Sequence, residues 1–297
     1  MNVLPREKQI EAIAALCEGV SVRATERLTG VNRGTILSLG ARVGKGCAKL
    51  HDSLMRNLHV DRCELDEAWS YVAKKEKMLT AEDGPEKGDQ YIFLAMAGVA
   101  KAIVSYRVGK RDQENTTAFA ADLRQRVLGK PEISSDGWTC YPEAIDDAFG
   151  LDVTYGQIVK NYNVPGRVVE AARRYSPAQV VSVTKRSMIG RPKRISTSFI
   201  ERQNLTLRMQ QRRSTRLTNA FSKKLENHEA AVALYVMHYN FCRVHETLRV
   251  TPAMQLGMAD HVWTIGELVG AALDGVVSEP VGRKVGRFTV LDGGLKD

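Results

Sequence analysis

Three acidic residues that lie far apart in the chain could bind divalent metal ions together. Asp66 lies in CELDEAWSYV, a segment that alternates apolar and polar side chains as a strand does, and Asp136 ends a shorter segment of this kind, EISSDGW. Glu201 is near the start of a predicted helix over residues 198–213. Carboxylate oxygens suit Mg²⁺ or Mn²⁺, and two such ions can activate a hydroxyl and stabilise the leaving oxygen of a phosphodiester. The three residues therefore predict a catalytic site that holds two Mg²⁺ or Mn²⁺ ions.

Each carboxylate also has a purely structural interpretation. Asp66 could be a solvated strand residue, and Asp136 with Gly137 could form an ordinary turn, in which Asp is favoured by local hydrogen bonding. Ser198 and Glu201 have the spacing of a capping box, in which the glutamate accepts a hydrogen bond at the start of its own helix. Against this last alternative, Glu201 is the one acid among twelve Lys or Arg residues between positions 185 and 224.

The net charge of +9 is concentrated in that segment, and the rest of the chain is close to neutral. Such a distribution is typical of a surface that binds a polyanion, although a solvated basic face without a function is the alternative. Asn204, Arg208 and Arg212 share one stripe of the predicted helix with Glu201, and we expect them to contact the DNA backbone. The residues of this segment predicted to bind DNA are Asn204, Arg208, Arg212, Arg213, Arg216, Lys223 and Lys224.

A small helical domain is predicted at the N-terminus. Ser21 and Asn32 can cap two consecutive helices, and Gly30 can end the first of them. Two short helices joined by a Gly-containing turn are typical of a helix-turn-helix, although a plain three-helix packing module is the alternative. In a helix-turn-helix the residues at base edges would be Asn32, Arg33, Thr35 and Ser38, and those at phosphates would be Arg42 and Lys45.

The remaining elements predict an α/β fold. Three strand segments from residue 61 onward are followed by a helix, a strand, a helix and a fifth strand, LDVTYGQIVK. This order is found in RNase H-like nucleases and integrases, so we expect a mixed five-stranded sheet flanked by helices. The predicted domains are a helix-turn-helix domain over residues 1–58, a catalytic domain over 59–249 with an irregular basic insertion at about 155–197, and a C-terminal tail over 250–297.

Several blocks of the sequence resemble, in order, the DDE transposases of the insertion-sequence-one family. They include ELDEAWSYV, SSDGWTCYP, YNFCRVHETLRVTPAM and the long block ISTSFIERQNLTLRMQQRRSTRLTNAFSKKLENH, and the resemblance extends from about residue 3 to about residue 270. It implies that Asp66, Asp136 and Glu201 are the catalytic triad, that Mg²⁺ is required, and that the RNase H-like core joins element ends to target DNA. The cysteine zinc module often found in this family is missing ahead of the predicted helix-turn-helix.

The function expected from these features is DNA transposition: binding of terminal inverted repeats, phosphodiester hydrolysis and strand transfer. A catalytically inactive, transposase-derived DNA-binding regulator is the alternative, and a general RNase H-type nuclease would not explain the helix-turn-helix. The expected partners are double-stranded DNA and further copies of the chain, because two element ends require at least two active sites. No segment approaches the roughly 18 apolar residues of a membrane span. We therefore expect a cytoplasmic, nucleoid-associated protein of bacterial or archaeal type.

Overall fold

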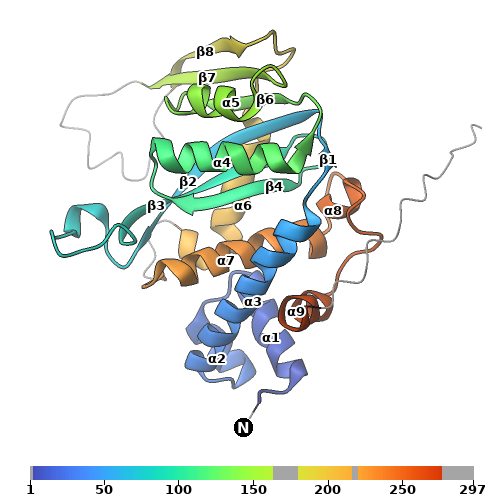
Figure 1. Cartoon of the computed structure of the whole chain (residues 1–297). Coiled ribbons are helices and arrows are strands. Elements are labelled where there is room, and N and C mark those ends of the chain that lie inside the picture. The colour runs from blue at the N-terminus through green and yellow to red at the C-terminus, as the bar shows by residue number, and fades with distance from the viewer. Residues whose placement is uncertain (1–2, 163–179, 216–219, 276–297) are drawn as a thin grey trace, which may run out of the picture.

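A six-stranded mixed sheet forms the centre of the computed structural model, which describes residues 3–162, 180–215 and 220–275 (Figure 1). The strand order is β4-β3-β2-β6-β7-β8. Strands β2, β3 and β4 pair antiparallel, β6 is parallel to both β2 and β7, and β8 is antiparallel to β7. The strands are β2 (Arg62–Val72), β3 (Gly88–Ala97), β4 (Ile103–Gly109), β6 (Glu132–Asp136), β7 (Thr154–Tyr162) and β8 (Val180–Ile189). Two short strands, β1 (Leu58–His59) and β5 (Val127–Leu128), pair separately.

Helices cover both faces of the sheet, which explains why its first strands are apolar on both sides. On one face, Leu65 and Phe93 belong to the same buried cluster as Phe119 of α4 (Gln113–Arg126) and Ile145 of α5 (Tyr141–Phe149). On the other face, a second cluster joins residues of β2 and β3 to α6 (Ser198–Gln210) and α7 (Leu225–Met237). The mixed α/β architecture predicted from the sequence is confirmed.

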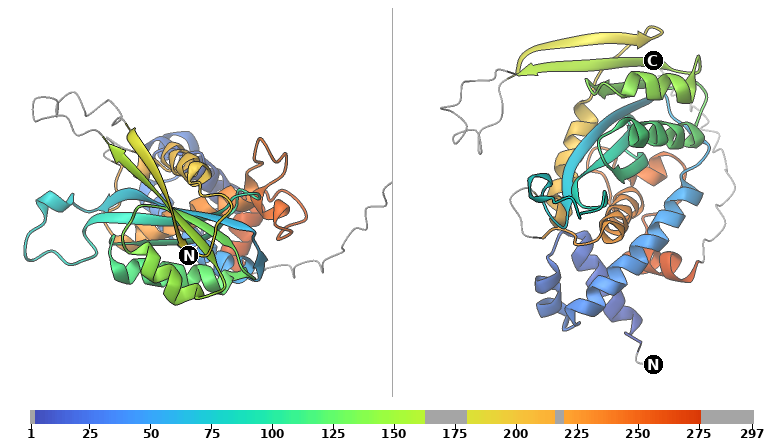
Figure 2. Two further views of the ribbon diagram at one scale, coloured as in Figure 1. Left: turned by 90° about the horizontal axis from the view of Figure 1, so that it is seen from above. Right: turned by 60° about the vertical axis from the view of Figure 1, so that its left-hand side comes forward.

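The predicted count of five strands is wrong, because β8 adds a sixth. It lies in the segment expected to be an irregular insertion at about 155–197, whose first part is β7. All side chains of β8 before Ile189 are exposed, so no buried face imposes the alternation from which a strand is recognised in a sequence. The β7–β8 ribbon lies at the opposite end of the molecule from the N-terminal helices (Figure 1 and Figure 2).

Three helices precede the sheet, with the caps expected from the sequence. They are α1 (Arg6–Cys17), α2 (Val22–Thr29) and α3 (Arg33–Leu54). The Ser21 hydroxyl accepts a hydrogen bond from the Ala24 amide, Gly30 ends α2 with a left-handed φ of 71°, and the Asn32 side chain accepts one from the Gly34 amide. Helix α3 spans 22 residues, well beyond the short segment that begins at Arg33 in the prediction.

The long α3 connects the N-terminal helices to the rest of the molecule. It packs along α7 and along α9 (Ile265–Asp274), which follows the short α8 (Pro252–Gln255). The C-terminal segment that the sequence left unassigned thus contributes α8 and α9 to the core, while residues 276–297 lie outside the described residues. In the described part of the chain, we find no helix with the length and hydropathy needed to cross a membrane.

Candidate active site

The first two predicted ligands lie on neighbouring strands. Strands β2 and β6 run parallel, and their register pairs Leu65 with Ser135, so Asp66 and Asp136 follow side by side. Asp136 is the last residue of β6, and its Oδ1 accepts a hydrogen bond from the Trp138 amide at 3.0 Å in the turn that follows. The sheet therefore brings together two acids that are separated in the sequence by β3, β4, α4 and the short β5.

A third carboxylate, which the sequence analysis did not select, completes a compact acidic cluster with these two. Asp66, Glu67 and Asp136 each offer one oxygen, and the three oxygens lie within 4.8 Å of one another. Neighbouring side chains on a strand point to opposite faces, so the sequence does not predict that Asp66 and Glu67 share a site. Asp136 is the last residue of β6, and at this strand end its carboxylate lies close to those of both Asp66 and Glu67.

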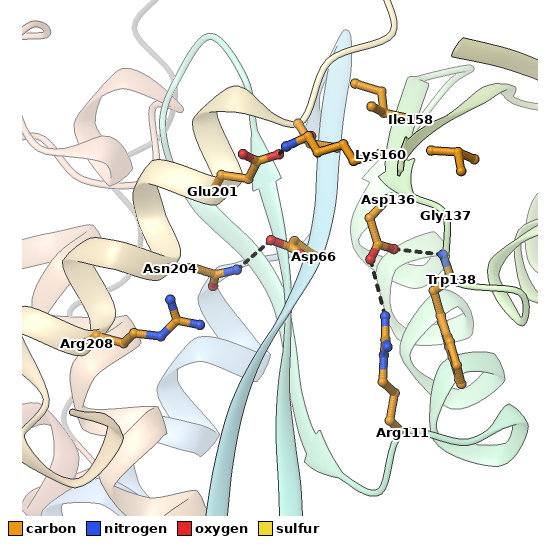
Figure 3. A pocket seen from close by; sticks show the side chains of 12 residues that line it. Asp66, Arg111, Asp136, Gly137, Trp138, Ile158, Lys160, Glu201, Asn204 and Arg208 are labelled. Atoms are coloured by element: carbon orange, nitrogen blue, oxygen red, sulfur yellow. Dashed lines mark hydrogen bonds and ion pairs between the residues drawn. The ribbon is translucent and has the colours of Figure 1, made fainter. Parts of the chain in front are cut away.

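Glu201 lines the same cavity but is not part of that cluster. The cavity has a volume of about 530 Å³, and Asp66 and Asp136 also line it. The Glu201 carboxylate pairs with the Lys160 ammonium from β7 and accepts a hydrogen bond from the Thr197 hydroxyl at 2.6 Å. Figure 3 shows Asp66 between Glu201 and Asn204 of α6 on one side and Asp136 on the other. The Glu201 side chain is 42% exposed, against 2% for Glu67.

The capping box considered for Glu201 is not formed. Thr197 precedes the helix without a side-chain capping bond. The first amides of α6 are instead satisfied by Glu64 of β2, whose Oε2 accepts hydrogen bonds from Phe199 and Ile200 at 2.7 and 3.1 Å. Because Glu64 holds the helix start, the carboxylate of Glu201 is left to face the cavity.

A second contact fixes α6 against β2 one turn further along. The Asn204 amide donates a hydrogen bond to Asp66 Oδ2 at 2.8 Å (Figure 3). Asn204, predicted as a DNA-backbone contact, is buried in this position and orients the carboxylate of Asp66. Glu64 and Asp66 lie on the same face of β2, so alternate residues of one strand position the helix that carries Glu201.

Burial and mutual repulsion make the cavity unfavourable for uncompensated negative charge. Burial, and then the charge of Asp136, raises the pKa of Asp66 to about 6. The same two causes raise the pKa of Glu67 to about 7, and burial also raises the pKa of Asp136. A cation within reach of these oxygens would stabilise their charged forms.

Two basic side chains compensate part of this charge. Arg111 donates hydrogen bonds to Glu67 at 3.1 Å and to Asp136 at 3.2 Å, and its guanidinium lies 4.2 Å from the centre of the Trp138 ring. Lys160 pairs with Glu201 across the cavity. Neither residue is predicted from the sequence, because only the fold brings them to the acids.

The other residues predicted to bind DNA fall into two groups. In the N-terminal helices, all of the predicted residues are exposed: Asn32, Arg33, Thr35, Ser38, Arg42 and Lys45. In the basic segment, Arg212, Lys223 and Lys224 are exposed, Arg208 lines the cavity, and Arg216 lies outside the described residues. Arg213 is engaged within the protein, since it donates hydrogen bonds to Ser222 and to the carbonyl of Asn227.

Comparison with known proteins links the chain to a mobile element. It is similar to the insertion element iso-IS1n protein InsB of Shigella dysenteriae, with 23% identity over 179 residues. The match covers 60% of this chain and 96% of that protein. No protein-family model matches the chain. The comparison supports a relationship to insertion-sequence proteins, at an identity too low to assign a catalytic class.

Proposed function

We propose that this chain is a DDE transposase, which binds the ends of an insertion sequence and cuts and rejoins DNA strands. The observation that carries the proposal is that Asp66, Asp136 and Glu201, predicted from the sequence as one site, line one cavity. The similarity to an insertion element protein supports the same conclusion. So does the succession of three antiparallel strands and two parallel ones with helices between them, which is the RNase H-like order.

The residues present fit divalent metal ions. Three carboxylate oxygens within 4.8 Å are hard ligands. The pKa values of Asp66 and Glu67 are raised first by burial and then by the charge of Asp136, and a bound cation would favour the charged forms. Asp66 and Asp136 would hold the ions, with Glu201 as the ligand from the helix side. When bound, two Mg²⁺ or Mn²⁺ ions would activate the attacking hydroxyl and stabilise the leaving oxygen.

The chain's own residues would then position the DNA strand. Arg111 and Lys160 lie at opposite sides of the cavity and can contact the phosphates on either side of the reacting one. Arg208, one helical turn beyond Asn204 on α6, would contact the backbone further along. Asn204 keeps the Asp66 carboxylate oriented throughout, because its hydrogen bond comes from the helix and not from solvent.

Recognition of the element ends is assigned to the exposed side of α2 and α3, in the manner of a helix-turn-helix. Their polar and basic residues provide groups for both base edges and phosphates. Work on two ends at once requires at least a dimer on DNA. The same function implies a bacterial or archaeal protein that acts at the nucleoid.

Strand cleavage of a duplex that contains the element end, in the presence of Mn²⁺ or Mg²⁺, tests the proposal. Glu201→Gln should reduce cleavage and joining by on the order of a hundredfold or more, as expected when a group that stabilises the transition state loses its charge. Glu7→Gln, the same substitution at an exposed glutamate in the first turn of α1, is the matched control and should be fully active.

Metal binding provides a readout that does not depend on activity. Mn²⁺ should raise the melting temperature of the wild type and should not raise that of Asp66→Asn. At a hundredfold excess of Mn²⁺ over its Kd, the expected stabilisation of the wild type is about 3 kcal/mol of unfolding free energy. Specific DNA binding without metal binding or cleavage would contradict the proposal and identify an inactive, transposase-derived regulator. Sequence-independent cutting of RNA–DNA hybrids would instead indicate a general nuclease.

A further inference from the structure

Three aromatic side chains form a row of tilted rings, here called the aromatic stack, outside both hydrophobic cores. The ring centres of Trp69 and Tyr71 are 5.7 Å apart, and those of Tyr71 and Phe221 are 5.1 Å apart, with interplanar angles of 33° and 31°. None of the three belongs to either core cluster or to the partly buried residues packed against them, and each is half-buried. Packing in either hydrophobic core therefore does not account for these three rings.

The stack continues the candidate active site along β2. Glu67, Trp69 and Tyr71 are alternate residues of this strand and face the same side of the sheet. At about 3.3 Å per residue, Trp69 lies roughly 7 Å and Tyr71 roughly 13 Å along the strand from Glu67. Tyr91, directly opposite Trp69 on β3, has the Arg111 guanidinium 5.8 Å from its ring centre. Arg111 thus contacts the acidic cluster and also approaches the aromatic rings.

Phe221 is brought to the stack by a specific backbone connection. Ser222 forms a bridge with Val72 at the end of β2, and its carbonyl accepts a hydrogen bond from Ala73 at 2.8 Å. Arg213 holds the same segment through the Ser222 hydroxyl at 2.8 Å. The contacts of Ser222 with β2 and with Arg213 therefore hold the ring of Phe221 beside Tyr71.

The chemistry of this surface fits unpaired nucleobases. Aromatic faces stack on bases of any sequence, and nearby cations neutralise the backbone that carries them. Lys75 has its Nζ 5.9 Å from the centre of the Tyr71 ring, and exposed Lys223 follows Phe221 by two positions. We propose that Trp69, Tyr71 and Phe221 bind unpaired bases of the DNA strand whose phosphate enters the acidic cavity. This inference rests on the proposed function for the identity of the strand.

Binding of a single strand in EDTA tests the inference without any catalytic step. The probe is a fluorescein-labelled oligothymidylate of about 12 nucleotides, compared with a duplex of the same length by fluorescence anisotropy. Tyr71→Leu and Phe221→Leu should each weaken single-strand binding by about tenfold and change duplex binding little. Tyr71→Phe keeps the ring and should bind like the wild type. Met78→Ala, which removes an exposed apolar side chain from the same hairpin, is the matched control.

The outcomes separate this inference from the proposed function. If Tyr71→Leu and Phe221→Leu bind the oligothymidylate as tightly as wild type while folded, the stacking surface is refuted, even if the protein cleaves DNA. If they lose binding in a protein that never cleaves DNA, the surface stands and the catalytic proposal fails. A change in self-association without a change in oligothymidylate binding would overturn the inference in favour of contact with a second copy.

Discussion

At the scale of single residues, Glu64 decides where Glu201 points. Its carboxylate accepts hydrogen bonds from the amides of Phe199 and Ile200 in the first turn of α6. These are charge-assisted hydrogen bonds at the positive end of a helix. Burial raises the pKa of Glu64, while the two amide hydrogen bonds lower it. We expect Glu64→Ala to cost about 2 kcal/mol of unfolding free energy. Glu64→Gln should cost less, since the amide oxygen of Gln can accept both hydrogen bonds but carries no full charge.

The measurement for Glu64 combines urea unfolding with DNA cleavage. If Glu64 positions α6, Glu64→Gln will fold and bind Mn²⁺ through the aspartates but cleave DNA more slowly. Glu132 of β6 lies on the same sheet and accepts hydrogen bonds from the amides of Lys193 and Arg194. Glu132→Gln is therefore the control, with no expected effect on cleavage. Unchanged cleavage by a folded Glu64→Ala would show that α6 keeps its place without this cap.

At the scale of secondary-structure elements, two glycines let α3 pack closely against its neighbours. A Cβ added at Gly44 would lie 2.1 Å from the carbonyl oxygen of Ala230 in α7, and one at Gly46 would lie 1.9 Å from that of Ala272 in α9. Gly46→Ala should therefore destabilise the protein by about 1 to 3 kcal/mol, although alanine favours a helix. Gly270→Ala in α9, where nothing lies within 4 Å of the added carbon, should instead stabilise it by up to about 1 kcal/mol.

Thermal unfolding of the two variants measures both effects, and equal stabilisation by the two alanines would contradict the close packing.

These helix contacts are not predicted from the sequence, whereas the local signals at the helix ends are. Caps at Ser21 and Asn32 and the end at Gly30 are local signals, and the structure has them. From the sequence alone, the glycines of α3 indicate only a weaker helix, because the helices that pack against them are distant in the chain. Likewise, β8 has no buried face. Glu67, Arg111 and Lys160 meet the predicted acids only through the fold.

At the scale of the whole molecule, buried histidines join the helices to the sheet. His51 of α3 contacts the carbonyl oxygen of Ile103 at 3.3 Å, and His228 of α7 contacts the Ser70 hydroxyl at 2.9 Å. Burial is the main reason that both pKa values are lowered to about 4. Each histidine is neutral in the fold but gains a proton on unfolding below pH 6.5, so its contribution to stability is lost as the pH falls from 6.5 towards 4.

Comparison of variants isolates this effect, because the raised pKa of Asp66 acts in the opposite direction and stabilises the fold as the pH falls through 6. Between pH 7.5 and 5, wild type should lose about 2 kcal/mol more unfolding free energy than His228→Gln, whose amide can still donate to Ser70. Urea unfolding at the two values checks this. Parallel losses in both proteins would mean that His228 already carries a proton in the folded state.

The N-terminal helices and one face of the sheet share one of the two hydrophobic clusters, which bears on the predicted boundary at residue 58. One buried cluster includes Ile36 and Val43 of α3, Leu65 of β2, Met237 of α7 and Leu268 of α9. Removal of residues 1–58 would expose the partners of α3, so we expect the helices and the sheet to unfold in one cooperative transition. Hydrogen exchange at increasing urea tests this, with amides of α3 and β2 expected to lose protection at the same midpoint. A lower urea midpoint for α1 to α3 would instead indicate an independent N-terminal domain. DNA bound there could then not affect the cavity through the contact of α3 with α7.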